Sequence, residues 1–240
     1  MTAIETSALT KKYKDLTAVN ALDLVVDEGE LFALLGVNGA GKSTLIKMLS
    51  CLAKPTSGDA KIFDHSIITE THEVKKLINV SPQETAVAPN LSVRENLEFI
   101  AGIYSAKNPR ESASREIEEM GLSSVAGKKA KTLSGGWQRR LSIAMALISE
   151  PKLLFLDEPT LGLDVIARRE LWSVIKKLRS RTTVILTTHY LEEAENLSDR
   201  IGIMSHGSIV ACGTAEELIA LSGKENFEDA FVTLAGGENA

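Results

Sequence analysis

The chain has 240 residues, of which 44% are hydrophobic and 25% are charged, and its formal net charge at pH 7 is -5. These proportions are typical of a folded globular protein and exclude general disorder. The 27 basic residues are outnumbered by 32 acidic ones, whereas binding to a nucleic-acid backbone favours a basic surplus. We therefore expect one large domain and no nucleic acid among its partners.

The sequence contains no stretch that suits a membrane-spanning helix. The longest run without Asp, Glu, Lys or Arg, residues 201–215, includes His206 and is shorter than the 18 or more apolar residues that such a helix needs. Residues 1–9 lack the basic and apolar regions of a secretory signal. The two cysteines, Cys51 and Cys212, form no CxxC pair. We expect a cytoplasmic protein without a cysteine metal site.

The N-terminal region predicts β-structure that leads into a buried strand. Apolar residues partly alternate over 18–26, and Asp-Glu-Gly at 27–29 predicts a turn. Residues 31–35 form an unbroken apolar run, which suits a strand buried on both faces. Apolar residues over 45–52 have the spacing of one helical face. A glycine-rich loop lies between this strand and this helix.

That loop, residues 36–43, has the sequence G-x-x-x-x-G-K-S and predicts a phosphate-binding (Walker A) loop. Glycines let backbone N–H groups face inward, and the start of the following helix adds positive potential. We expect Lys42 to reach the β and γ phosphates of a nucleotide and Ser43 to offer its hydroxyl to Mg²⁺. The alternative is an ordinary glycine-rich turn, which Lys42 and Ser43 together disfavour.

Residues 91–150 predict a helical segment. Ser92 with Glu95, and Asn108 with Glu111, are helix starts with a capping partner three residues later. These two helices precede a third.

The third helix of this segment begins at Ser134, Gly135 and Gly136. Backbone N–H groups at a helix start lack partners within the helix, so this end can bind an anion. Taken alone, the Ser-Gly-Gly sequence indicates only a helix cap. Its place in a chain that already holds a phosphate-binding loop favours the anion-binding interpretation.

A short apolar strand over 153–156 ends in Asp157 and Glu158. Such a strand delivers an acidic group to the carboxyl edge of a sheet, beside bound phosphates. We expect Asp157 to be the acid that faces the metal ion. Neighbouring strand residues point to opposite faces, so Glu158 is free to orient or deprotonate a water molecule. An acidic turn over 158–160 is the alternative.

The rest of the chain alternates helices and strands, which predicts a parallel crossover and a mainly parallel sheet. The predicted order is helix, strand, helix, strand, strand and helix, over residues 164–180, 182–188, 191–197, 201–204, 209–211 and from 214 onward.

In the order of its motifs, the sequence resembles the nucleotide-binding subunit of an ATP-binding cassette (ABC) transporter over nearly its whole length. The motifs are the Walker A loop at 36–44, Gln83, the signature at 133–138, the Walker B strand ending in Asp157 and Glu158, Asp164, and His189. Residues 191–213 and 227–231 look most like the ATPases of bacterial ABC-2 type efflux systems.

The resemblance implies an α/β fold: a P-loop NTPase core with a mainly parallel sheet, an N-terminal antiparallel β subdomain and an inserted α-helical subdomain. It implies one ABC ATPase domain over residues 1–240. Within it, about 1–90 and 151–240 form the nucleotide-binding core with the β subdomain, and about 91–150 form the helical signature subdomain.

The resemblance also assigns ATP and Mg²⁺ as cofactors. It implies catalytic roles for Glu158, His189 and Gln83, and Mg²⁺ ligands at Ser43, Gln83 and Asp157. The nucleotide-binding residues that it implies are Tyr13, Asn38, Gly39, Ala40, Gly41, Lys42, Ser43, Thr44, Ser134, Gly135 and Gly136.

Two of these residues have simpler alternatives. Tyr13 is assigned to stacking on adenine, for about 1–3 kcal/mol, and an edge-strand aromatic is the alternative. His189 is assigned to the γ-phosphate, and a structural histidine at a strand end is the alternative. The motif position favours stacking for Tyr13. The predicted strand before His189 ends at the same sheet edge as Asp157, which favours catalysis.

The family pairs two such domains head to tail, with each ATP between the Walker A loop of one and Ser134 to Gly136 of the other. The resemblance therefore implies a second copy of the chain, or a homologous ATPase subunit, as a partner. It also implies a separate integral membrane permease that receives energy for export and contacts residues 83–104. The chain would then lie peripherally on the inner face of the cell membrane.

A soluble ABC ATPase that moves no solute, such as an iron–sulfur assembly ATPase, is the alternative function. Chromosome-maintenance ATPases are disfavoured because no sustained heptads separate Lys42 from Ser134. A P-loop kinase or GTPase is disfavoured because it needs no Ser-Gly-Gly helix start, and no guanine-reading N-K-x-D sequence occurs.

Overall fold

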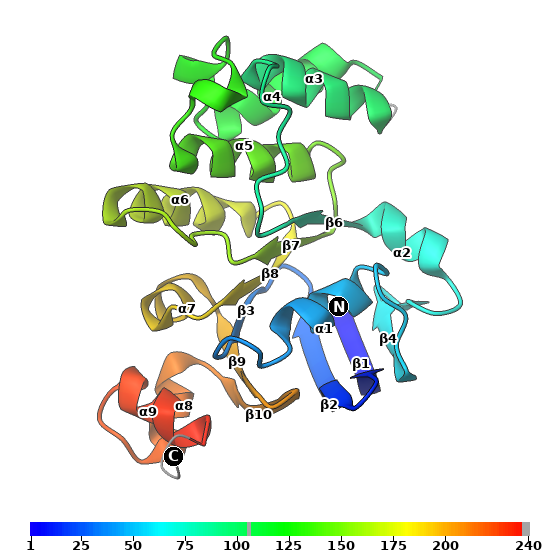
Figure 1. Ribbon diagram of the computed structural model, residues 1–240, viewed down its shortest axis with the longest axis vertical. Coiled ribbons are helices and arrows are strands. Elements are labelled where there is room, and N and C mark those ends of the chain that lie inside the picture. Colours follow the sequence, from blue (N-terminus) through cyan, green and yellow to red (C-terminus); the bar gives the residue numbers. More distant parts are fainter. Residues whose placement is uncertain (105–106, 237–240) are drawn as a thin grey trace.

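A six-stranded sheet forms the centre of the computed structural model, which describes residues 1–104 and 107–236 (Figure 1). The strand order is β10-β9-β3-β8-β7-β6. All neighbours run parallel except β9 and β10. This confirms the predicted mainly parallel sheet. The strands are β3 (Leu31–Leu35), β6 (Ile78–Ser81), β7 (Leu153–Asp157), β8 (Thr183–Thr188), β9 (Arg200–Ser205) and β10 (Ser208–Gly213).

A second sheet has the order β2-β1-β4-β5, with every pair antiparallel. It confirms the predicted N-terminal antiparallel structure. The sequence predicts β2 in part but gives no separate signal for β1, because Ala8 has a positive φ of 46° and the strand register shifts near it. The strands are β1 (Thr2–Tyr13), β2 (Leu16–Asp27), β4 (Ser57–Ile62) and β5 (His65–Ser66).

Helices α3, α4 and α5 lie between β6 and β7 in the chain and stand at one end of the molecule in Figure 1. Ser92 and Glu95 form the predicted capping box of α3, and Asn108 caps α4. Two 3₁₀ turns, Ser123–Val125 and Ala130–Thr132, precede α5. The first five α-helices are α1 (Lys42–Leu49), α2 (Thr71–Leu77), α3 (Val93–Ile103), α4 (Pro109–Glu119) and α5 (Gly135–Leu147).

The helices over 165–178, 191–197 and 215–222 follow the predicted alternation, and Thr214 with Glu217 forms a capping box at the third of them. The region from 214 onward, predicted as one helix, forms two. Within residues 1–104 and 107–236, no helix has the length and apolarity needed to cross a membrane. The remaining helices are α6 (Val165–Leu178), α7 (Leu191–Leu197), α8 (Ala215–Ser222) and α9 (Phe227–Leu234).

Strand β3 is buried along its whole length because each of its faces packs against a different core. Leu31, Ala33 and Leu35 face the cluster that includes the buried side chains of α3 to α6. Phe32 and Leu34 face the cluster shared with α1 and the antiparallel sheet. A strand between two apolar layers has an unbroken apolar sequence. Strand β8 is a parallel partner of β3 and β7 is the parallel partner of β8, so the carboxyl ends of these three strands lie at the same edge of the sheet.

An ion-pair cluster joins the helical segment to the end of α6. Glu116 of α4 is fully buried and accepts from Arg181 at 2.8 Å. Arg181 also pairs with Glu119, and Arg115 pairs with Glu150. These contacts tie α4 to the segments that precede β7 and β8, at the opposite end of those strands from the predicted site.

Candidate functional site

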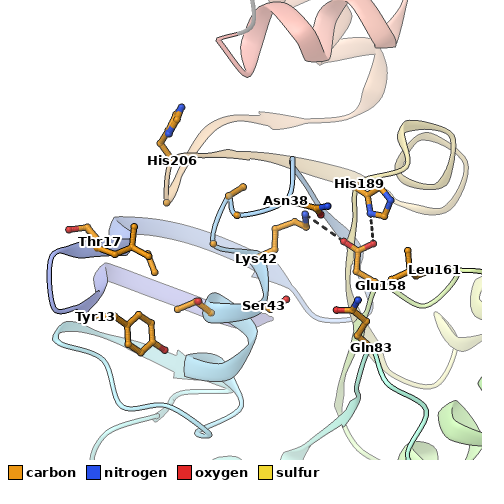
Figure 2. Close-up of a pocket in the computed structure, with 17 residues that line it drawn as sticks. Tyr13, Thr17, Asn38, Lys42, Ser43, Gln83, Glu158, Leu161, His189 and His206 are labelled. Atoms are coloured by element: carbon orange, nitrogen blue, oxygen red, sulfur yellow. Dashed lines mark hydrogen bonds and ion pairs between the residues drawn. The ribbon is translucent and has the colours of Figure 1, made fainter. Parts of the chain in front are cut away.

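A cavity of about 570 Å³ lies at the carboxyl ends of β3, β7 and β8 (Figure 2). One side is formed by the loop between β3 and α1, and the other by residues that follow β6, β7 and β8. Eleven of its lining residues are predicted site residues: Tyr13, Asn38, Gly39, Ala40, Gly41, Lys42, Ser43, Thr44, Gln83, Glu158 and His189. The fold thus brings these predicted site residues, which are distant in the chain, together around one cavity.

The glycines of the β3–α1 loop are required by close backbone approaches. Gly41 has a φ of 107°, and a Cβ there would lie 2.3 Å from the Ala18 carbonyl oxygen. A Cβ on Gly36 would lie 2.4 Å from the Met204 carbonyl oxygen. Only glycine fits both positions without moving the backbone of β2 or β9. The loop is consequently curled tightly between the two sheets.

Lys42 is the buried cation of this loop, with 6% of the residue exposed. Its Nζ donates to the carbonyl oxygens of Gly36 at 2.6 Å and Val37 at 3.3 Å. The same Nζ lies 3.6 Å from Glu158 Oε1. Burial lowers the pKa of the Lys42 ammonium, and the Glu158 carboxylate opposes this effect. An anion that enters the cavity meets a positive charge that is only partly neutralised.

Asp157 lies beside Ser43 at the end of β7. Ser43 Oγ donates to Asp157 Oδ1 at 3.2 Å, and Thr187 Oγ1 donates to the same oxygen at 2.6 Å. Among the described residues, no three His, Cys, Asp or Glu side chains form a metal cluster. Hydroxyl, carboxylate and amide oxygens are the donor types that Mg²⁺ takes from a protein, and Ser43, Asp157 and Gln83 could supply them.

The Glu158 carboxylate lies between Lys42 and His189. Its Oε2 lies 2.8 Å from His189 Nδ1, while its Oε1 faces Lys42 (Figure 2). The residue has a positive φ of 48°, and its backbone N–H donates to both the carbonyl and the hydroxyl of Thr187. A side chain in this rarely populated conformation is held there by its surroundings. The carboxylate is thereby fixed between a lysine and a histidine.

Tyr13 lies at the opposite end of the cavity from Glu158 (Figure 2). Its side chain is half exposed, and Lys11 Nζ lies 5.0 Å from the ring centroid. The ring is therefore available for stacking instead of being packed in the core.

Six other lining residues were not identified from the sequence: Leu16, Thr17, Ala18, Leu161, His206 and Gly207. His206, in the β9–β10 turn, is exposed and also lines the cavity. The β9–β10 turn reaches the site because Gly207 N–H donates to the Ala40 carbonyl at 3.0 Å. No local sequence signal marks such a contact.

Ser134, Gly135 and Gly136 do not line this cavity. They form the exposed start of α5, and in the part of the chain that the structure describes, the Ser134 hydroxyl makes no capping bond to the helix. A Cβ on Gly136 would lie 3.1 Å from the Ala167 Cβ, so this glycine also permits close packing of α5 against α6. This helix start therefore lies outside the cavity formed by the chain's own phosphate loop.

Glu193 is a fully buried carboxyl group on α7. Its Oε1 accepts from Trp172 Nε1 at 3.0 Å, while Oε2 has no hydrogen-bond partner among the described residues. Burial raises the pKa of Glu193, and the hydrogen bond from Trp172 opposes this effect. The folded chain therefore retains the proton at pH values where an unfolded glutamate has lost it.

Replacing Glu193 with glutamine should flatten the pH dependence of stability. Because the folded pKa is raised, the parent loses stability as pH rises from the ordinary glutamate pKa through the folded one, and it stays less stable above it. We expect Tm of the Glu193→Gln variant to exceed that of the parent near pH 8, with the gap closing near pH 5. Exposed Glu195→Gln on the same helix is the control. Parallel Tm curves for parent and Glu193→Gln would contradict the prediction.

Comparison with known proteins gives a consistent result. A family model described as ABC transporter matches residues 19–161. The daunorubicin/doxorubicin resistance ATP-binding protein DrrA of Streptomyces peucetius is 44% identical over 219 residues, covering 90% of this chain and 66% of DrrA. The daunorubicin resistance ATP-binding protein DrrA3 of Streptomyces coeruleorubidus is 40% identical over 230 residues, covering 95% of this chain and 73% of DrrA3.

A solved structure also matches. The dimeric post-hydrolysis state of the ATP-binding cassette MJ0796, bound to ADP and Pi, has a TM-score of 0.78 and 28% sequence identity. The match covers 88% of this chain and 98% of the other. The similarity therefore extends to the arrangement of both sheets and the helical segment.

Proposed function

Because this chain belongs to the ABC transporter family and is an ATPase domain of that family, we propose that it is the subunit that hydrolyses MgATP to power a separate integral membrane permease. The observation that carries the proposal is the position of Glu158, held between Lys42 and His189 at the edge of the cavity. In this proposal residues 1–240 act as one ATPase domain, with about 91–150 as its helical signature subdomain and the remainder as its core.

The phosphates of ATP would lie in the curled loop, where Lys42 and backbone N–H groups of residues 38–44 meet them. Tyr13, at the far end of the cavity, would stack on the adenine. Ser43, Asp157 and Gln83 would hold Mg²⁺, which neutralises charge on the phosphates.

Glu158 would act as the general base. A carboxylate held between a lysine and a histidine can orient a water molecule and accept its proton. His189, on the other side of that carboxylate, would donate a hydrogen bond to the γ-phosphate and stabilise the charge that develops there. Gln83 would contact the same water from the loop after β6.

Hydrolysis would require a second copy of the chain or a homologous subunit. Ser134 to Gly136 lie outside the chain's own cavity, with exposed backbone donors at a helix start. In a head-to-tail pair, these donors would meet the nucleotide held by the other subunit. The dimeric state of the matched ATP-binding cassette supports this arrangement.

The permease partner would contact residues 83–104 and place the chain at the inner face of the cell membrane. The matched resistance ATP-binding proteins favour export through an ABC-2 type permease over iron–sulfur assembly. Coexpression with a candidate ABC-2 permease tests this. We expect the chain to sediment with membranes only when the permease is present, and its ATPase rate to change in that complex. A chain that stays in the soluble fraction with several such permeases would contradict the proposal.

Replacing Ser134 with arginine should leave ATP binding by the single chain intact and abolish hydrolysis. The bulky side chain would block the approach of α5 to the nucleotide of the other subunit, while the chain's own loop is untouched. Binding is measured by calorimetry and hydrolysis by phosphate release.

A mixing experiment provides the control. Ser134→Arg and Lys42→Ala chains should each be inactive alone, whereas their heterodimer retains one composite site made of two intact halves. Loss of ATP affinity in the Ser134→Arg chain alone would instead place Ser134 at its own nucleotide.

A further inference from the structure

Arg139 is a buried arginine on α5 that the sequence does not single out. Only 4% of the residue is exposed. Its Nη1 donates to the Pro82 carbonyl at 2.6 Å, and its Nη2 donates to the carbonyls of Gln83 at 2.5 Å and Glu158 at 3.4 Å. Among the described residues, no carboxylate forms an ion pair with it. All of its hydrogen bonds go to backbone oxygens.

A buried arginine without a carboxylate partner is a poor choice for a residue that only stabilises the fold. Burying a guanidinium without a carboxylate partner is costly, and an apolar side chain would fill the same space with less penalty. The rest of the buried α5 face is largely apolar, with Leu141 and Ile143 fully buried. The arginine at this one place therefore indicates a requirement for its donors.

The three carbonyls belong to the segments that carry the proposed water-contacting residues. Pro82 and Gln83 follow β6, and Glu158 follows β7. The planar fork of an arginine fixes several acceptors in one geometry, which a flexible ammonium does less well. Arg139 is thus bonded to both segments from a single rigid helix.

We propose that Arg139 is a positioning residue, which holds the backbones of Gln83 and Glu158 in register for hydrolysis. It acts through those two residues and does not touch the substrate. Since Ser134 begins the same helix, the fork also connects the surface that would meet the other subunit to this chain's own water-activating residues. The inference rests on the proposed ATPase function and concerns how its catalytic groups are held.

Replacing Arg139 with methionine, which keeps similar bulk and removes every donor, tests the proposal. We expect kcat for ATP hydrolysis to fall on the order of a hundredfold, because a shift of about 1 Å in reacting groups has that effect. ATP affinity of the single chain should stay near that of the parent, because the phosphate loop is untouched. Arg139→Lys should give a kcat between those of the parent and Arg139→Met.

The split between kcat and KM separates positioning from a general structural role. A residue that holds the water-contacting groups should affect kcat and leave KM for MgATP near that of the parent, and Arg139→Lys should recover part of kcat because lysine restores a donor. Exposed Arg110→Met, on α4 of the same helical segment, is the control and should match the parent in both kcat and KM.

Each outcome decides the question. A kcat for Arg139→Met within about twofold of the parent overturns the proposal, as does a loss of kcat matched by an equal loss of ATP affinity. If Arg139→Met does not fold, Arg139→Lys carries the test, and a rate equal to that of the parent overturns it. Absence of ATPase activity in the parent would instead contradict the proposed function.

Discussion

The Lys42→Ala variant is expected to lose ATP affinity by about a hundredfold to ten-thousandfold. Hydrogen bonds to charged groups are worth about 1.5–3 kcal/mol each, and Lys42 would make them to two phosphates. Its buried ammonium already lies within the curl of the loop, and among the described residues that line the cavity it is the only lysine or arginine. Calorimetry with MgATP measures the loss, and stabilisation of the chain by ATP against heat should disappear.

Lys47→Ala is the matched control, because Lys47 is an exposed lysine in the last turn of the same helix. It should bind ATP like the parent. Circular dichroism should show that Lys42→Ala remains folded, since an alanine fits at the start of α1. If Lys42→Ala binds and hydrolyses ATP at the parent level, the phosphate-binding loop has been assigned wrongly.

The Glu158→Gln variant should bind MgATP and hydrolyse it about a hundredfold to ten-thousandfold more slowly, the usual contribution of a positioned general base. Glutamine keeps the shape and the hydrogen-bonding reach to His189 but cannot accept the proton. It also removes a negative charge 3.6 Å from Lys42, which should favour the triphosphate. Phosphate release under saturating MgATP measures the rate.

The same variant should form an ATP-dependent dimer on size exclusion, because the nucleotide that closes the pair is not cleaved. The parent and the Glu195→Gln control should remain mostly monomeric without a permease. Turnover at the parent rate would remove Glu158 from catalysis. Failure to dimerise at about millimolar MgATP would contradict the head-to-tail arrangement that gives Ser134 its role.

Much of the fold could be predicted because the relevant signals are local. The apolar run at 31–35 predicts a strand covered on both faces, and Ser92 with its capping partner predicts the start of α3. The strand β1 could not be predicted in the same way, because the shift in register near Ala8 breaks its alternation. Periodicity reports burial only where the pairing is regular.

The site residues likewise divide into those with a local sequence signal and those without one. The phosphate loop and the strand that ends in Asp157 have fixed spacings, so their residues could be named from the sequence. The contacts of Arg139 could not, because they join a helix to two loops that are distant in the chain and involve only backbone oxygens. Hydrogen bonds to carbonyls leave no pattern of residue types. The role of Gly136 in packing against Ala167 is also hidden, because the contact joins two helices that are separate in the chain.

The contact between the phosphate loop and the β9–β10 turn bears on the entropy of ATP binding. Gly207 donates to Ala40 and its carbonyl accepts from Asn20, so two backbone hydrogen bonds link the phosphate loop to β2 through the β9–β10 turn. A loop fixed in this way is ordered by folding itself. Nucleotide then enters a preorganised cradle and binding loses little conformational entropy. Affinity for ATP in this chain should therefore depend on the integrity of both sheets, and not on the loop sequence alone.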